Sequence, residues 1–126
     1  MINEQLAESS FSRQGLHKII ELMDRKDKVV FITGVNGKIY FANSSVEGLE
    51  DFKEETLIGQ KIDLFIENYC NIEELMLWEG SLTNVPVYFR WNGALLPGYL
   101  NVSLVMQSEK VEHVVYMISL KSKAES

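Results

Sequence analysis

The sequence predicts an α+β domain in which five antiparallel strands form one sheet and short helices cover it. Runs of β-branched and aromatic residues meet at two Asn-Gly pairs, residues 36–37 and 92–93, and such pairs are typical of tight hairpins. Between the hairpins, Gly48 and Gly59 divide a polar segment into pieces too short for long helices. The last third of the chain then reads as three further strands.

The first hairpin runs through VVFIT (29–33), the turn and IYFA (39–42). Asn43 closes its second strand and is predicted to cap a short helix that starts at the polar pair 44–45. These strands are apolar on both faces, which predicts a sheet that is covered on both sides.

The middle segment predicts a series of short helices. The acidic pair 54–55 suits the first turn of one helix, because carboxylates there favour the macrodipole. An apolar cluster follows at 62–66. Asn71 is then predicted to cap a short helix, IEELMLW (72–78), with apolar residues on one side.

In the C-terminal third, strands are predicted at 85–91, 94–107 and 114–120, with a polar turn at 108–110. The Pro97-Gly98 pair falls inside the second of them. Because proline cannot donate to a sheet ladder, the pair predicts a bulge or an edge irregularity.

Residues 14–24 predict an amphipathic helix before the first strand. Its apolar positions recur at spacings of three and four, at Leu16, Ile19, Ile20 and Met23. This stripe is expected to dock, either on the open face of the sheet or against a second copy of the chain in a homodimer.

Composition narrows the class of protein. The 126 residues suit one domain, and the net charge of −6 with scattered Lys and Arg argues against nucleic-acid binding. No segment is apolar enough to span a bilayer, and the N-terminus lacks a secretory signal. A single cysteine excludes an intrachain disulfide and suits a reducing compartment. A cytoplasmic domain without membrane or nucleic-acid partners is expected.

The order of elements over residues 29–120 resembles that of a PAS domain. In that family an apolar run, an Asp, two residues and a Gly precede a strand that ends in Asn. Gly37, Ile39 and Asn43 match this pattern, whereas Gly34 stands where the Asp is usual. The segment EETLIG (54–59) also resembles the family's "eeLiGk" turn, and its matching residues are Leu57, Ile58 and Gly59.

The resemblance implies a PAS-like sheet with strand order 2-1-5-4-3 and helices on one face. It divides the chain into an N-terminal flanking helix (1–28), the PAS domain (29–120) and a polar tail (121–126) that leads to an output domain. Members are mainly sensory or dimerising modules. The expected role is therefore signal input to a bacterial histidine kinase or transcriptional activator, through ligand- or partner-dependent changes of packing.

The resemblance also implies a small-molecule pocket between the sheet and the helices. The residues that it would place at this pocket are Phe31, Thr33, Tyr40, Phe65, Tyr69, Leu75, Trp78, Arg90, Asn101 and Ser103. Asn101 and Ser103 share one strand face and can orient a polar ligand, and Arg90 can pair with a carboxylate. The alternative is that the aromatic residues are core, and the domain is a scaffold for dimerisation without a pocket.

No cofactor is predicted. Flavin-photosensing PAS domains carry Asn-Cys-Arg-Phe shortly after the glycine turn, and residues 60–63 here are QKID. Photoactive yellow proteins carry a Tyr before the strand-ending Asn, where this chain has Ala42. Haem-binding members use a His on the last helix, and IEELMLW has none. Cys70 is accordingly expected to be a small buried hydrophobe.

No catalytic or metal site can be assembled from the sequence. His17 and His113 are far apart and are expected at or near the surface, and one cysteine adds little to them. The sequence has no phosphate-binding loop, and its paired carboxylates are helical neighbours that point apart. A protein that is not an enzyme is expected, with a small α+β enzyme using the same cavity as the other alternative.

Overall fold

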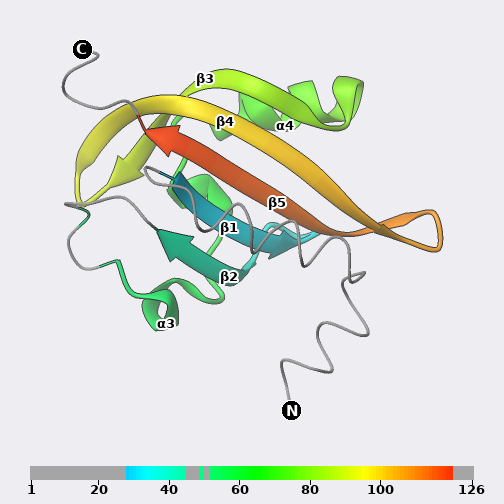
Figure 1. Ribbon diagram of the computed structural model, residues 1–126, viewed down its shortest axis with the longest axis horizontal. Coiled ribbons are helices and arrows are strands. Elements are labelled where there is room, and N and C mark those ends of the chain that lie inside the picture. Colours follow the sequence, from blue (N-terminus) through cyan, green and yellow to red (C-terminus); the bar gives the residue numbers. More distant parts are fainter. Residues whose placement is uncertain (1–27, 45–48, 50–51, 121–126) are drawn as a thin grey trace.

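The computed structural model of the chain describes residues 28–44, 49 and 52–120. In chain order its elements are β1 (Lys28–Gly34), β2 (Ile39–Ser44), α3 (Glu54–Leu57), η1 (Ile62–Leu64), α4 (Tyr69–Glu79), β3 (Leu82–Trp91), β4 (Ala94–Gln107) and β5 (Lys110–Leu120). The strands form one antiparallel sheet in the order β2-β1-β5-β4-β3 (Figure 1). The predicted strand order is therefore confirmed.

Two-residue turns of left-handed backbone join β3 to β4 and β4 to β5. Asn92 and Gly93 have φ of 48° and 81°, and Ser108 and Glu109 have φ of 51° and 67°. Positive φ at both turn positions matches the twist of the flanking strands, so the ladder continues right up to each turn. For this reason β5 begins at Lys110, opposite Gln107, and not at residue 114 as predicted.

The predicted bulge at Pro97-Gly98 is wrong. Pro97 pairs with Tyr88 and Gly98 with Val87 in unbroken register, and the shifts lie elsewhere, between Leu82 and Val85 and between Val105 and Met106. A Cβ at Gly98 would lie 2.6 Å from the backbone oxygen of Ser119. Glycine is thus needed there because β4 and β5 approach closely, not because the strand kinks.

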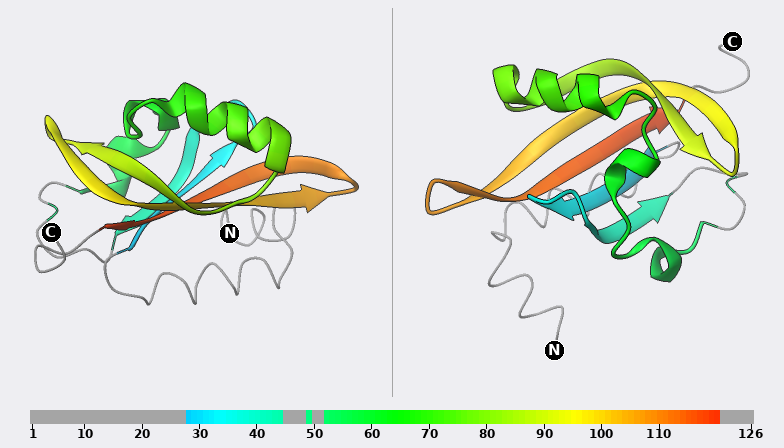
Figure 2. Two further views of the ribbon diagram at one scale, coloured as in Figure 1. Left: turned by 90° about the horizontal axis from the view of Figure 1, so that it is seen from above. Right: turned by 180° about the vertical axis from the view of Figure 1, so that it is seen from behind.

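The helices α3, η1 and α4 lie on one face of the sheet, as predicted (Figure 2). The main hydrophobic core fills the space between them. Its aromatic centre stacks Phe31 on Phe65, with ring centroids 5.6 Å apart, and Phe89 on Trp91, 5.8 Å apart. Leu57, Ile62 and Ile72 contribute the helical side of this core.

The opposite face of the sheet is also apolar, which confirms the two-sided pattern read from the strands. Val30, Ile32 and Val115 form a second buried cluster there, and Phe41, Val105 and Met117 pack against it. The predicted stripe Leu16, Ile19, Ile20 and Met23, the flanking helix 1–28 and the tail 121–126 lie outside the described residues, apart from Lys28 at the start of β1.

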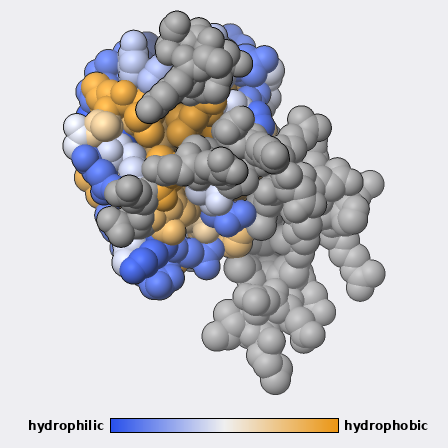
Figure 3. Space-filling model, turned by 60° about the vertical axis from the view of Figure 1, so that its left-hand side comes forward, coloured by the Kyte–Doolittle hydropathy of each residue, from blue (hydrophilic) through white to orange (hydrophobic). Residues whose placement is uncertain are grey.

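Apolar residues also reach the surface. On the side of the molecule where the β3–β4 hairpin turns, hydrophobic residues gather in one area with hydrophilic residues around it (Figure 3). Leu95, beside this turn, is 49% exposed. The described part of the chain therefore presents apolar surface in addition to its two clusters.

Both outer strands of the sheet are covered by irregular chain. Beside β2, Ile39 N–H donates to the Gln60 carbonyl at 2.9 Å, and Gly59 N–H donates to the Ile39 carbonyl at 2.8 Å. Beside β3, Arg90 N–H donates to the Phe65 carbonyl at 2.8 Å. These bonds pair some of the outward-facing backbone groups of the edge strands, and the same segments lead into η1 and α4 above the sheet.

Candidate functional site

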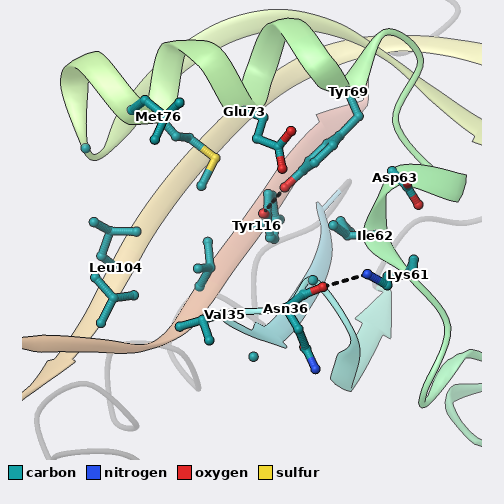
Figure 4. A pocket seen from close by; sticks show the side chains of 16 residues that line it. Val35, Asn36, Lys61, Ile62, Asp63, Tyr69, Glu73, Met76, Leu104 and Tyr116 are labelled. Atoms are coloured by element: carbon teal, nitrogen blue, oxygen red, sulfur yellow. Dashed lines mark hydrogen bonds between the residues drawn. The ribbon is translucent and has the colours of Figure 1, made fainter.

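A cavity of about 340 Å³ lies between α4, the β1–β2 turn and the β4–β5 hairpin (Figure 4). Residues of five parts of the chain line it. They are Gly34, Val35, Asn36 and Gly37 of the β1–β2 turn region, Lys61, Ile62 and Asp63 at η1, Tyr69, Glu73, Met76, Leu77 and Gly80 along α4, Leu104 of β4, and Val111, Val114 and Tyr116 of β5.

Local sequence explains why α4 contributes a whole row of side chains. Tyr69, Glu73 and Met76 are separated by four and three residues, so they share one helix face. Asn68, with φ of 57° in the left-handed region, turns the chain into the helix ahead of them. Ile72 is 4% exposed and anchors α4 to the core beside this row.

Two tyrosine hydroxyls meet at one end of the cavity. The hydroxyl oxygens of Tyr69 and Tyr116 are 2.6 Å apart, a hydrogen bond in which either can donate, and their ring centroids are 6.2 Å apart. Tyr116 is 1% exposed, whereas Tyr69 is half-buried. This bond ties the start of α4 to the centre of the sheet.

Burial raises the pKa of both phenols above the ordinary value of 10.0, and it is the largest cause for each. The carboxylate of Glu73 raises the pKa of both further through its negative charge, and Asp63 does the same for Tyr69. Both hydroxyls therefore stay neutral across the physiological pH range. They serve as hydrogen-bond donors and acceptors there.

Charged and apolar residues occupy different parts of the lining. Lys61, Asp63 and Glu73 are exposed at its rim, and Lys61 Nζ donates a hydrogen bond to the Asn36 carbonyl at 3.0 Å. The remaining wall is apolar and includes Met76, Leu104, Val111 and Val114. Such a lining can hold a small molecule by its apolar part and orient it through a few polar groups.

Of the ten residues predicted to bind a ligand, Tyr69 alone lines this cavity. Phe31, Thr33 and Phe65 are buried in the main core under the helices. Leu75 and Trp78 lie on α4 but are 39% and 83% exposed and do not line it.

The other four predicted residues lie on the far face or at an edge. Asn101 and Ser103 do share one face of β4, but Met117 and Val115 opposite them place it on the side away from the helices. Tyr40 contacts His113 on that side, with ring centroids 5.2 Å apart. Arg90 pairs with a carboxylate, that of Glu67 of this chain.

The helix was expected at 72–78, which included Glu73 and Met76 but missed their helical spacing from Tyr69. Asn71 is not its cap, because α4 begins at Tyr69 and has eleven residues. A reading that began the helix at Tyr69 would have placed Glu73 and Met76 beside it, at helical spacing. The sequence did not indicate that Tyr116 lines a cavity, because this residue lies within an apolar run that predicts only a buried strand.

Two further expectations are wrong. Cys70 is exposed in the first turn of α4, because the helix turns Ile72 and not Cys70 toward the core. His113 is buried at 6% exposure, and its Nδ1 lies 3.2 Å from the Thr33 carbonyl, which a buried imidazole needs as a partner. His17 lies outside the described residues. Within residues 28–44, 49 and 52–120, no cluster of His, Cys, Asp or Glu is placed to hold a metal ion.

Among the described residues, no helix has the length and apolar character needed to cross a membrane. No protein-family model matches the chain. No curated protein matches it at a significant level.

Solved structures share the fold of the chain at low sequence identity. A PAS domain from a two-component sensor histidine kinase is 12% identical, with a TM-score of 0.65 over 87% of this chain and 100% of that one. A PAS domain from Colwellia psychrerythraea is 14% identical, with a TM-score of 0.66 over 86% and 98%. A chain of the DhaR(N)–DhaL complex of E. coli is 13% identical, with a TM-score of 0.59 over 93% and 38%. An RNA-binding light-oxygen-voltage receptor is 15% identical, with a TM-score of 0.58 over 87% and 34%.

Proposed function

The chain has the PAS fold, and we propose that it is a sensory input domain that binds a small molecule in the cavity beneath α4. In this proposal it is a cytoplasmic part of a bacterial histidine kinase or transcriptional activator, and it works as a homodimer. Its similarity to the sensor histidine kinase PAS domain, which it covers completely, supports the signalling role. The cavity is the single observation that carries ligand binding.

A ligand in this cavity would touch both the helix that covers the sheet and the sheet itself. Tyr69, Glu73 and Met76 belong to α4, whereas Leu104 and Tyr116 belong to the centre of the sheet. Filling the space between them favours one spacing of helix and sheet over others. Differential binding to two packing states is sufficient to shift the population between them. The signal would leave through the sheet and the segments that flank it.

The tyrosine pair favours binding over catalysis. A general base must lose its proton near the working pH, and the raised pKa of both phenols keeps them protonated there. Their hydroxyls can instead orient a ligand. The alternative of a scaffold without a pocket would require side chains to fill this space, which the cavity of about 340 Å³ does not favour.

Native mass spectrometry of the purified chain tests the proposal, because it reports a bound small molecule and the oligomeric state together. Leu104→Trp places an indole in the cavity and should remove the bound mass. Ser103→Trp, one residue away on the opposite face of β4, is the matched control and should retain it. Circular dichroism confirms that both variants fold. Wild-type protein that carries no adduct and gains none from a metabolite extract would contradict a sensory pocket.

A further inference from the structure

The cavity has an excess of negative charge that its own residues do not neutralise. Lys61 is the one cation in its lining, and its Nζ already donates to the Asn36 carbonyl at 3.0 Å. The side chains of Asp63 and Glu73 form no hydrogen bond or ion pair with any residue of the described ranges. Two carboxylates and one ammonium give the lining a net charge of −1.

Glu73 is the carboxylate best placed to meet a ligand. It projects from the middle of the cavity-facing row of α4 toward the paired hydroxyls of Tyr69 and Tyr116 (Figure 4). Its charge is felt at both phenols, since it raises the pKa of each. A negative potential therefore exists at the end of the cavity where the two neutral hydroxyl oxygens and the two aromatic rings lie. Each of these features attracts a cation.

The remaining wall of the cavity favours an apolar group on the ligand. Met76, Leu104, Val111 and Val114 present apolar atoms on the side away from the charges. A volume of about 340 Å³ is at the small end of the range for ligand sites, so the occupant has room for one short apolar group. A carboxylate ligand would meet Glu73 and Asp63 as like charges, which disfavours it.

We propose that the cavity binds a small monocationic amine with an apolar group, whose ammonium lies between Glu73 and the Tyr69–Tyr116 hydroxyl pair. The apolar group then packs against Met76 and the β4–β5 wall. This inference rests on the proposed ligand-binding function and adds the chemical class of the ligand.

Three ligands with the same six-carbon chain and different charges test the proposed chemical class of the ligand. Isothermal titration calorimetry at low salt compares hexylamine, 1-hexanol and hexanoate on the purified chain. Hexylamine should bind at least about fivefold more tightly than 1-hexanol, as a favourably placed ion pair allows, and hexanoate should bind most weakly. Glu73→Gln should remove most of the advantage of hexylamine and leave 1-hexanol unchanged. Glu74→Gln, the next residue of α4 and outside the lining, should behave as wild type.

The assignment would be overturned by hexylamine that binds no more tightly than 1-hexanol, and also by equal losses in the Glu73 and Glu74 variants. Leu104→Trp should abolish hexylamine binding, and unchanged affinity in that variant would place the amine elsewhere. An adduct in native mass spectrometry that Leu104→Trp removes, together with failure of hexylamine, would refute the amine and leave the sensory pocket standing. The failures of the two proposals are therefore distinguishable.

Discussion

At the scale of single residues, the Tyr69–Tyr116 pair links the cavity to the energetics of the fold. The hydroxyl of Tyr116 is withdrawn from water and has Tyr69 as its partner at 2.6 Å. An ionised phenol at this position would lose its solvation and face the charge of Glu73. The same burial that keeps the pair neutral therefore makes folding depend on pH.

The first prediction is a loss of stability at alkaline pH. Unfolded tyrosines ionise near 10.0, whereas the folded pair, with raised pKa values, keeps its protons to higher pH. The folded state binds more protons in that window, so the contribution of the pair to the free energy of unfolding should be constant below about pH 10 and fall above it. Urea unfolding from about pH 9 to about pH 11 measures this. Tyr116→Phe should reduce the loss, whereas Tyr88→Phe, at a 53% exposed position, should retain it.

The second prediction concerns Asn43 near the end of β2, opposite Val30. The helix that it was predicted to cap was expected to start at 44–45, but β2 continues through Ser44, so such a helix can begin only at residue 45, outside the described residues. If Asn43 caps a helix there, Asn43→Ala should lower the free energy of unfolding by about 0.5–2 kcal/mol. Asn71→Ala is the matched control, since Asn71 lies inside α4 and should cost little. Equal denaturation midpoints for wild type and Asn43→Ala would show that Asn43 is not a cap.

At the scale of elements, strands were easier to predict than helices. The hairpin at Asn92-Gly93 can be predicted from the local sequence, because only a few residue types accept positive φ at two successive positions. The start of α4 cannot be predicted in this way. Asn68 has a left-handed backbone conformation and forms no side-chain cap. The helix start at Tyr69 therefore depends on tertiary contacts, which a short stretch of sequence does not reveal.

The candidate site was harder to predict than the fold for the same reason. Which face of β4 carries Ser103 and which carries Leu104 follows from the pairing with β5, and not from the alternating pattern alone. Both faces of this sheet are apolar, so the pattern did not identify the face that the helices cover. Asn101 and Ser103 were grouped correctly with each other, yet they lie away from the cavity.

The third prediction tests how α4 is held over the sheet. Ile72 is 4% exposed in the main core, and Ile72→Ala should lower the free energy of unfolding by about 2–4 kcal/mol through lost burial and a new cavity. Leu77, on the same helix, is 84% exposed, so Leu77→Ala should change it by less than about 0.5 kcal/mol. Equal costs in urea unfolding would mean that α4 is not anchored through Ile72.

At the scale of the whole molecule, the fourth prediction is that the purified protein is colourless. The flavin-type cysteine motif is missing after Gly59, and α4 carries no histidine for haem. Although the fold resembles that of a light-oxygen-voltage receptor, the cysteine of this chain lies elsewhere, exposed on α4. Absorption spectra after expression in a cofactor-replete host should show no visible band. A band of cofactor-like stoichiometry would contradict this.

The last prediction is that the chain forms a homodimer through the stripe Leu16, Ile19, Ile20 and Met23. An isolated helix of this length is marginal in water, so an apolar stripe on it needs a surface to dock on. A two-fold interface would let two such stripes cover one another. Ile20→Glu places a charge in the seam and should shift the protein toward monomer while the sheet stays folded. Gln14→Glu, on the opposite side of the predicted helix, adds a charge of the same sign and should leave the dimer intact.

Sedimentation velocity separates the two places where the stripe can dock. If it packs only on its own sheet, wild type is monomeric at tens of micromolar, and Ile20→Glu lowers stability without changing mass. If it forms the dimer seam, wild type sediments as a dimer and Ile20→Glu as a folded monomer with an unchanged far-ultraviolet circular dichroism spectrum. A monomeric wild type would remove the dimer from the proposed mechanism. Any signal from the cavity beneath α4 would then have to leave the domain within a single chain.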